Sequence, residues 1–246
     1  MVDDLTRELM DSDAVPAGCK VCGARKYGIC KALRASELLQ FSNSTRRRKY
    51  TRGQTIVFED DEIVEFANIV TGSVKLVKLM SDGRQQIVGL QFAPEFIGKP
   101  FSDREPVSVE AATDVEVCVF PRADFEKMLA QQPDFERELL RLTLKQLDEA
   151  RKWMVTLGQK TAQEKLASFL MLMAKNKGLP VGDDPNKVEF VLPLKRSEIA
   201  EFLGLTIETV SRQLTILRQK NLISMENTHD ITVHDLAALQ TLSDGG

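Results

Sequence analysis

Residues 194–217 restrict the fold of this chain more than any other segment does. Ile199 and Leu203 are four residues apart, which is the spacing of the apolar face of a short helix, and Gly204 follows directly. A second apolar stripe at helical spacing comes next: Val210, Leu214 and Leu217. The segment therefore predicts two short helices that meet at a glycine turn, which is the form of a helix-turn-helix unit.

The face of the second helix opposite this stripe is polar, with residues spaced i, i+3, i+4 and i+7: Glu208, Ser211, Arg212 and Thr215. Arg212 can donate two hydrogen bonds to guanine, Glu208 can accept one from a cytosine or adenine amino group, and Ser211 can approach thymine. Glu208 and Arg212 could instead form a weak ion pair in solvent, but the compact two-helix setting favours base reading. We expect these DNA-contacting residues: Glu208, Ser211, Arg212, Thr209, Thr206 (also the expected N-cap) and Lys195.

Two features qualify this DNA-binding hypothesis. Residues 223–225 and 231–233 alternate around a polar turn and predict the hairpin wing of a winged helix. The net charge of −3 gives no general attraction for nucleic acid, so contact must come from local basic residues: Lys195, Arg196, Arg212, Arg218 and Lys220.

A long helix is predicted after Pro133. Its coiled-coil seam alternates three- and four-residue steps: Leu140, Thr143, Leu147, Ala150, Met154 and Leu157. This face could pack on the chain's own strands instead, but the length of the helix favours a dimer interface. A further amphipathic helix is predicted over 161–175, ended by Gly178 and Pro180, with a loop over 182–186.

Residues 45–120 read as short strands separated by turns at Thr71-Gly72 and at 81–83. Two runs alternate apolar and polar residues: Val74 and Leu76, then Val88, Leu90 and Phe92. This regular spacing favours a small antiparallel roll. The fold class is therefore α+β, with a cysteine-rich segment (1–35), a β-roll (36–132), a dimerisation helix (133–159) and a winged helix-turn-helix domain (160–246).

Three of the four cysteines lie close together in the sequence, at Cys19, Cys22 and Cys30, and Cys118 lies on a predicted strand. If Val115, Val117 and Val119 face the roll core, Cys118 faces outward, where the N-terminal segment can reach it; the opposite phase buries it as an inert thiol. Four thiolates without a histidine suit a structural zinc ion or an iron–sulfur cluster, and the spacing serves both.

The order of roll, long helix and winged helix-turn-helix resembles the catabolite-activator (CRP/FNR) superfamily, and Glu208-Thr-Val-Ser211-Arg212 resembles its FNR, fumarate and nitrate reduction, branch. The resemblance implies a [4Fe–4S] cluster on the four cysteines and a homodimer that binds an inverted repeat of TTGAT-type half-sites. It further implies that oxygen converts the cluster and weakens the dimer and its DNA binding. RNA polymerase is the implied partner, with the turn at Ser81-Asp82-Gly83-Arg84 a candidate contact by position. The alternative is a protein stabilised by zinc on the four cysteines, or an iron–sulfur protein that senses redox state or nitric oxide.

Other functions fit the sequence less well. Cyclic-nucleotide binding in this superfamily normally needs a Gly-Glu pair and a later Arg-Ser, but the chain reads Gly98-Lys99-Pro100 and then Val107-Ser108. The roll has no histidine for haem, since both histidines lie in or after the wing. An electron carrier would not need the base-reading stripe, and a thiol oxidoreductase would place Cys19 and Cys22 in a βαβ setting, which is not apparent. We expect no catalytic residues, no secretory signal, no membrane span and a cytoplasmic location.

Overall fold

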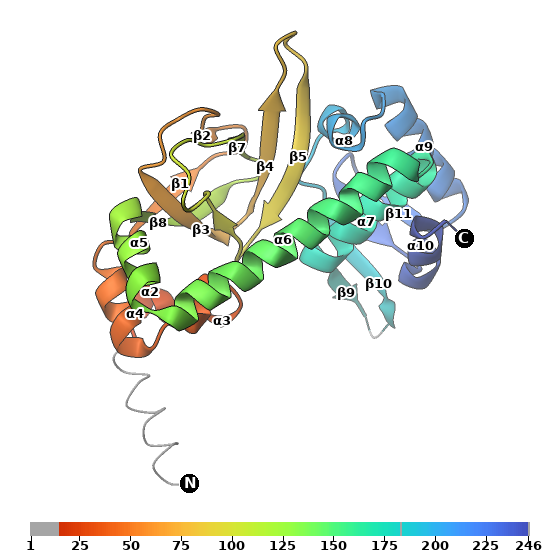
Figure 1. Ribbon diagram of the computed structural model, residues 1–246. Coiled ribbons are helices and arrows are strands. Elements are labelled where there is room, and N and C mark those ends of the chain that lie inside the picture. The colour runs from red at the N-terminus through yellow and green to blue at the C-terminus, as the bar shows by residue number, and fades with distance from the viewer. Residues whose placement is uncertain (1–14, 183, 246) are drawn as a thin grey trace. The chain divides into compact units, whose positions relative to one another are not determined.

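The computed structural model describes residues 15–182 and 184–245. The chain divides into two compact units, one formed by residues up to 78 together with 90–147, the other by 79–89 together with 148–246. The predicted α+β class is confirmed: strands form the first part, one long helix follows, and a helix-turn-helix with a small sheet completes the chain (Figure 1).

The predicted roll is present as two four-stranded sheets, ordered β1-β8-β3-β6 and β2-β7-β4-β5. Its strands are β1 (Arg46–Tyr50), β2 (Thr55–Val57), β3 (Glu65–Thr71), β4 (Ser73–Leu79), β5 (Gln85–Phe92), β6 (Phe96–Ile97), β7 (Ser108–Ala111) and β8 (Val115–Pro121). Gly72 makes the predicted turn between β3 and β4 with φ +86°, and a Cβ there would lie 2.3 Å from the Asp114 carbonyl oxygen. Only glycine therefore fits this turn.

The alternation expected along residues 88–92 is out of phase at its start. Val88 is 52% exposed, whereas its neighbour Ile87 is buried, and Phe92 is buried as expected. Apolar character alone does not fix which face a short strand buries, because both faces of a strand in a roll can carry apolar side chains.

Strand β8 has buried residues on both faces, which settles the phase that the sequence left open. Val115, Val117 and Val119 belong to the roll core. Phe120, on the other face, packs with the N-terminal helices and with α5 and α6. Cys118 shares the phase of Phe120, so it faces the N-terminal segment and not the roll core.

Short helices cover that face: α2 (Ala17–Lys20), α3 (Gly23–Lys26), the 3-10 helix η1 (Ile29–Ala32), α4 (Ala35–Ser42) and α5 (Arg122–Gln131) (Figure 1). Their core is rich in phenylalanine. Phe120 and Phe125 stack with ring centroids 5.3 Å apart, and Phe41 lies 5.1 Å from Phe120. Ile29 is fully buried in the same cluster, so the segment that carries three cysteines is held to the roll by apolar packing.

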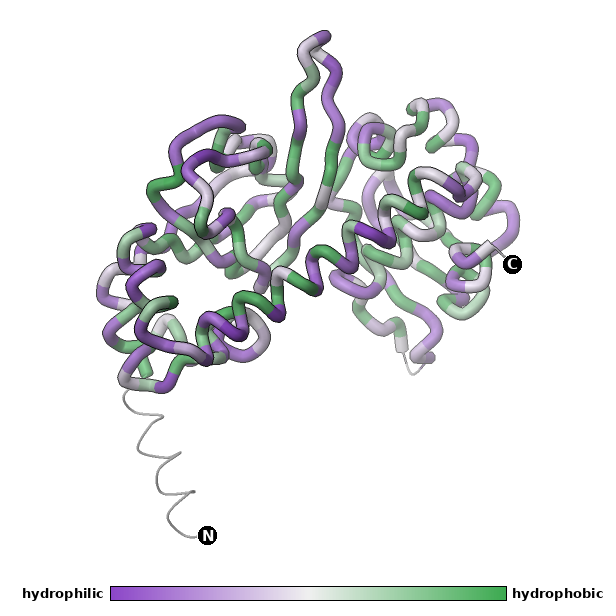
Figure 2. Tube along the Cα trace, in the orientation of Figure 1, coloured by the Kyte–Doolittle hydropathy of each residue, from purple (hydrophilic) through white to green (hydrophobic). Residues whose placement is uncertain are grey.

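Helix α6 (Pro133–Gln159) confirms the predicted long helix. Phe135 and Leu139 are buried against the phenylalanine core. All six residues of the predicted seam lie on exposed positions: Leu140, Thr143, Leu147, Ala150, Met154 and Leu157. Apolar and hydrophilic segments alternate along the helix in Figure 2. This part of the chain thus has one face for its own core and another that is open.

The C-terminal unit is a helix-turn-helix with a four-stranded sheet ordered β11-β12-β10-β9. Its elements are α7 (Ala162–Lys177), β9 (Leu179–Val181), β10 (Asp184–Val191), α8 (Arg196–Leu203), α9 (Ile207–Gln219), β11 (Ile223–Met225), β12 (Asp230–Val233) and α10 (Leu236–Ser243). Pro180 lies in β9, and β10 already begins at Asp184, so the loop predicted over 182–186 is too long. The irregular pairing between Asp184 and Val188 explains the error, because a bulge carries the turn-forming residues inside the strand.

Candidate cysteine site and DNA-reading helix

The four cysteines come from four elements of the N-terminal unit. Cys19 lies in α2, Cys22 is the N-cap of α3, Cys30 lies in η1, and Cys118 lies in β8. All four are free and partly buried. The structure therefore brings a thiol 88 positions distant in the sequence to the N-terminal trio.

Electrostatic interactions join every pair of these thiols. Cys118 and Cys22 each act on Cys19 and Cys30, Cys19 also acts on Cys30, and Cys22 acts on Cys118. Burial raises the pKa of Cys19, Cys30 and Cys118, and the neighbouring thiols raise it further. Burial therefore favours the thiol form of Cys19, Cys30 and Cys118, and binding of a metal centre would release their protons.

The spacing of the thiols bears on what they can hold. Among residues 15–182 and 184–245, no three His, Cys, Asp or Glu side chains lie close enough to surround one metal ion. Four thiolates on one zinc ion, with Zn–S about 2.3 Å, would bring the sulfurs within about 3.8 Å of one another. Cysteines that bind separate irons of a cluster are farther apart than the ligands of a single ion.

A positive charge and close packing hold the N-terminal segment that carries three of the cysteines in place. Arg47 lies beside Cys118 across β1 and β8, and its Nη2 donates to the Gly18 carbonyl oxygen at 3.1 Å. Its guanidinium lowers the pKa of both Cys19 and Cys118, against the larger effect of burial. Gly28 packs so closely on Pro94 that a Cβ would lie 2.8 Å from the Pro94 carbonyl oxygen.

The predicted helix-turn-helix is present. Gly204 ends α8 in the left-handed conformation, with φ 61° and ψ 43°. Thr206 caps α9 as predicted: the Thr209 amide donates to its Oγ1 at 3.2 Å. The predicted apolar stripe is buried: Val210, Leu214 and Leu217. The turn and cap are the local features that fix the angle at which α9 leaves α8.

The polar stripe lies on the opposite side of α9, with these members exposed: Glu208, Ser211, Arg212 and Thr215. In the described part of the chain, Glu208 and Arg212 form no ion pair with each other, so the alternative interpretation of this spacing is not realised. The backbone amide of Glu208 and the Thr206 side chain lower the pKa of the Glu208 carboxyl. Lys195, the N-cap residue of α8, is exposed, while Thr206 and Thr209 are partly committed to the cap.

The sequence did not reveal that two polar groups near the wing are buried. Arg196, the first residue of α8, is half-buried; its Nη2 lies 3.5 Å from Met225 Sδ, and its Nη1 has no hydrogen-bond partner in the described residues. Burial lowers the pKa of Arg196. The Nδ1 of His229 is likewise buried and unpartnered among those residues. Arg196 was visible in the sequence only as one charge among several.

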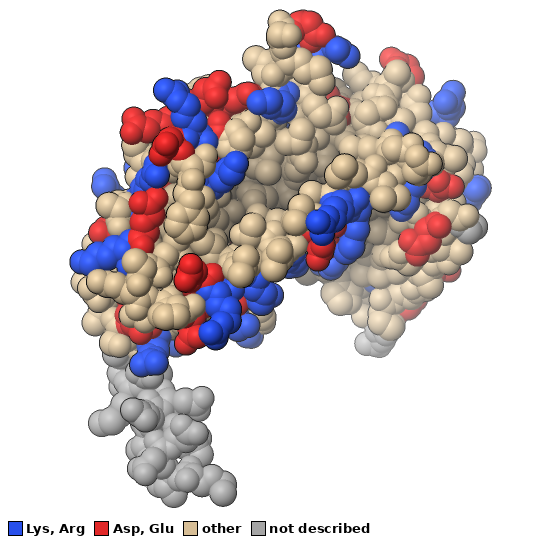
Figure 3. Space-filling model, in the orientation of Figure 1, with Lys and Arg blue, Asp and Glu red and all other residues tan. Residues whose placement is uncertain are grey.

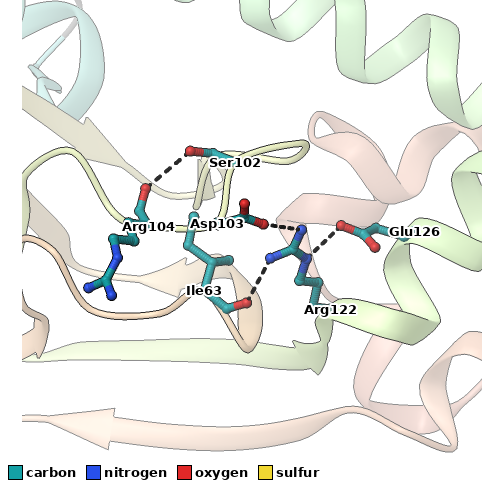
Figure 4. A network of polar contacts seen from close by, with 6 residues as sticks. All are labelled: Ile63, Ser102, Asp103, Arg104, Arg122 and Glu126. Atoms are coloured by element: carbon teal, nitrogen blue, oxygen red, sulfur yellow. Dashed lines mark hydrogen bonds and ion pairs between the residues drawn. The ribbon is translucent and has the colours of Figure 1, made fainter.

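Two further surfaces bear on binding. Charged groups of both signs lie among uncharged residues on the visible face of the roll, and a group of Lys and Arg side chains lies on α6 (Figure 3). Arg122, the first residue of α5, donates to Asp103 in the loop after β6 at 3.3 Å, to the Ile63 carbonyl oxygen at 3.3 Å and to Glu126 in its own helix at 2.7 Å (Figure 4). One contact of this network, that with the exposed Asp103, reaches the loop that lacks the nucleotide-gripping residues.

Comparisons with known proteins agree with this architecture. The family model of the Crp-like helix-turn-helix domain matches residues 164–242, and that of the cyclic nucleotide-binding domain matches residues 47–132. The chain is 45% identical over 239 residues to a probable transcriptional activator of Rhizobium leguminosarum bv. viciae, covering 97% of this chain and 98% of that protein. The chain belongs to the CRP/FNR family of transcription regulators.

Other members of the family are also similar. The transcriptional activator protein FnrL of Cereibacter sphaeroides is 38% identical over 222 residues, which is 90% of each chain. The structure of FixK2 from Bradyrhizobium japonicum matches with a TM-score of 0.73 and 30% identity, covering 80% of this chain and 96% of that one. A CRP/FNR member with this helix-turn-helix carries a DNA-binding domain at its C-terminus. None of the described helices is both long and apolar enough to span a bilayer.

Proposed function

We propose that this protein is an oxygen-responsive transcription activator that holds a [4Fe–4S] cluster on Cys19, Cys22, Cys30 and Cys118. The observation that carries the proposal is the position of Cys118 on β8 beside the N-terminal cysteines. Its strand partner Asn68 donates to Cys30, and its other strand partner Arg47 donates to the carbonyl oxygen of Gly18, the residue before Cys19. When bound, the cluster would supply the oxygen-reactive centre. The protein supplies the thiolates, the Arg47 charge and the apolar packing around η1.

The proposed target is an inverted repeat of TTGAT-type half-sites, bound by a homodimer. The exposed Glu208, Ser211 and Arg212 stripe supports base reading by α9. Arg196, with its unpartnered Nη1 at the start of α8, is a candidate phosphate contact because a helix N-terminus and a guanidinium both favour an anion. The open face of α6 supports dimerisation, since family members act as dimers and two copies of this face would bury each other's leucines.

Two further parts of the proposal concern ligands and partners. No cyclic nucleotide is expected, because the segment after β6 lacks the Gly-Glu and Arg-Ser elements. RNA polymerase is the proposed protein partner, and the turn between β4 and β5 is a candidate contact. In that turn Arg84 pairs with Asp82 at 2.8 Å on an exposed tip. The protein would act in the cytoplasm.

The test begins with protein purified without oxygen. We expect a coloured protein with about four irons and four sulfides per chain, which binds the operator tightly and loses both colour and binding in air. Replacement of each cysteine in turn by serine should abolish the colour. A colourless, zinc-containing protein that binds DNA equally in both conditions would refute the oxygen switch and favour the alternative of zinc on the four cysteines.

Base reading is tested separately with Arg212→Ala, measured on the operator and on operators with each base pair changed. Loss of Arg212 should cost about 5- to 150-fold in discrimination at one base pair of each half-site. The matched control, Lys220→Ala, removes the same charge just beyond the end of α9 and should weaken binding to all sequences alike. Unchanged sequence preference in Arg212→Ala would show that α9 reads bases through other side chains.

A further inference from the structure

Asn68 is a buried amide on the face of β3 that adjoins the cysteine site. It pairs directly with Cys118 across β3 and β8, and Cys118 in turn pairs with Arg47 on β1. The same register places Asn68 opposite Phe96 on β6. Only 1% of Asn68 is exposed, although a β-strand core normally takes an apolar residue at such a position.

The side-chain amide of Asn68 has one atom that is hydrogen-bonded and one that has no hydrogen-bond partner among the described residues. Its Nδ2 donates to Cys30 Sγ at 3.4 Å. Its Oδ1 is buried and has no hydrogen-bond partner among the described residues. A buried unpaired oxygen costs about 1–3 kcal/mol, so packing alone does not account for an asparagine here. Among the described residues, the one hydrogen bond that the side-chain amide makes is to sulfur.

We infer that Asn68 is a positioning residue of the cysteine site, which holds Cys30 by an N–H···S hydrogen bond and stabilises negative charge on that sulfur. Asn68 is also the strand partner of Cys118 across β3 and β8, so one residue lies beside two cysteines from distant parts of the chain. Hydrogen bonds to the sulfurs of a cluster raise its reduction potential, because they stabilise the more negative, reduced form. This inference rests on the proposed cluster for its redox part and on the sulfur contact alone for its structural part.

Asn68→Leu removes the donor while keeping the number and branching of the side-chain heavy atoms, and Asn68→Asp replaces it by an acceptor. Ser73→Ala is the matched control, because Ser73 is a fully buried polar residue of the roll whose backbone amide donates to Thr113 Oγ1 at 3.0 Å. The first measurement is the side-chain amide resonance of Asn68 in 15N-labelled apoprotein. We expect it to shift when Cys30 is replaced by alanine and to stay in place in Ser73→Ala.

The second measurement is the midpoint potential of the loaded protein, titrated with dithionite as the one-electron donor. In Asn68→Leu the ratio of reduced to oxidised cluster at a fixed potential should fall about tenfold, which is a lowering by about 59 mV for one electron. Asn68→Asp should lower it further or prevent loading. Ser73→Ala should match the unchanged protein, since it leaves the sulfur contact intact.

The outcomes separate the two proposals. If the unchanged protein holds no iron and sulfide but the Asn68 amide responds to Cys30, the proposed cluster is wrong and the sulfur contact stands. If the cluster is present and Asn68→Leu titrates like the unchanged protein, the positioning role is overturned. An amide resonance that does not respond to Cys30 would overturn it as well.

Discussion

Gly28→Ala should loosen the segment that carries three of the cysteines. The added Cβ would lie 2.8 Å from the Pro94 carbonyl oxygen, 3.0 Å from Ala24 Cα and 3.1 Å from the Ala24 carbonyl oxygen. All three atoms belong to the main chain, so no side chain can turn aside to make room. Overpacking of this kind costs about 1–3 kcal/mol.

This loss of stability affects mainly the segment around Cys30. Cys30 is two residues from Gly28, and its neighbour Ile29 is fully buried, so reagents reach Cys30 when the segment opens. A change of about 1–3 kcal/mol in that opening raises the alkylation rate of Cys30 about 5- to 150-fold. The assay is iodoacetamide labelling of reduced apoprotein, with the Cys30 peptide followed by mass spectrometry.

Gly18→Ala is the matched control, because Gly18 lies in the same segment and a Cβ there meets nothing within 4 Å. It should leave Cys30 labelling unchanged. Equal labelling rates in the two variants would mean that the Gly28–Pro94 contact does not hold the segment, and the packing argument would fail.

Three further predictions concern the other elements. Thr206→Ala should destabilise the helix-turn-helix by about 1 kcal/mol in thermal unfolding, because it removes the cap on the Thr209 amide. Thr206→Ser keeps the hydroxyl and should not. An equal loss of stability in both variants would contradict the cap. Hydrogen bonds from the Ala238 amide and Asn186 hold the pKa of Asp235 below its ordinary 3.8. The ionised Asp235 therefore adds stability above pH 3.8, and this stability is lost as the pH falls through the folded-state pKa. Asp235→Asn should therefore reduce the loss of folding stability as the pH falls. An unchanged dependence of stability on pH would contradict the cap bond. Leu147→Glu, but not Lys145→Glu, should give monomers by analytical ultracentrifugation if the open face of α6 is the dimer interface, and dimers of Leu147→Glu would exclude it.

Local patterns predicted the helix-turn-helix well, since its signals lie within 24 residues. Gly204 must adopt a left-handed conformation and Thr206 must cap a helix, and both requirements are visible as residue types in the sequence. The phase of β8 was not decidable in this way. Val117 and Phe120 are both apolar and both fully buried, so only the covering helices show that Cys118 faces the cysteine segment.

The neighbours of the cysteine site were also beyond the sequence. Asn68 lies 38 positions from Cys30, and Arg47 reaches Gly18 only because β1 pairs with β8. Register and long-range pairing determine these contacts, and a strand's residue types do not state its register. Helix α4 was missed for a different reason: it is as short as α8, but no glycine turn and capped second helix follow it to mark a helical unit.

The distance along the chain between Cys30 and Cys118 has a consequence for synthesis. A ribosome that adds about 5–20 residues per second makes Cys118 about 4–18 s after Cys30. During that interval the three early thiols lack their fourth partner, and β3 and β8, which place Asn68 and Cys118, have not paired. The proposed cluster can therefore reach its complete set of ligands only after the roll has folded, so delivery of iron and sulfide must follow the roll and not the emerging N-terminus.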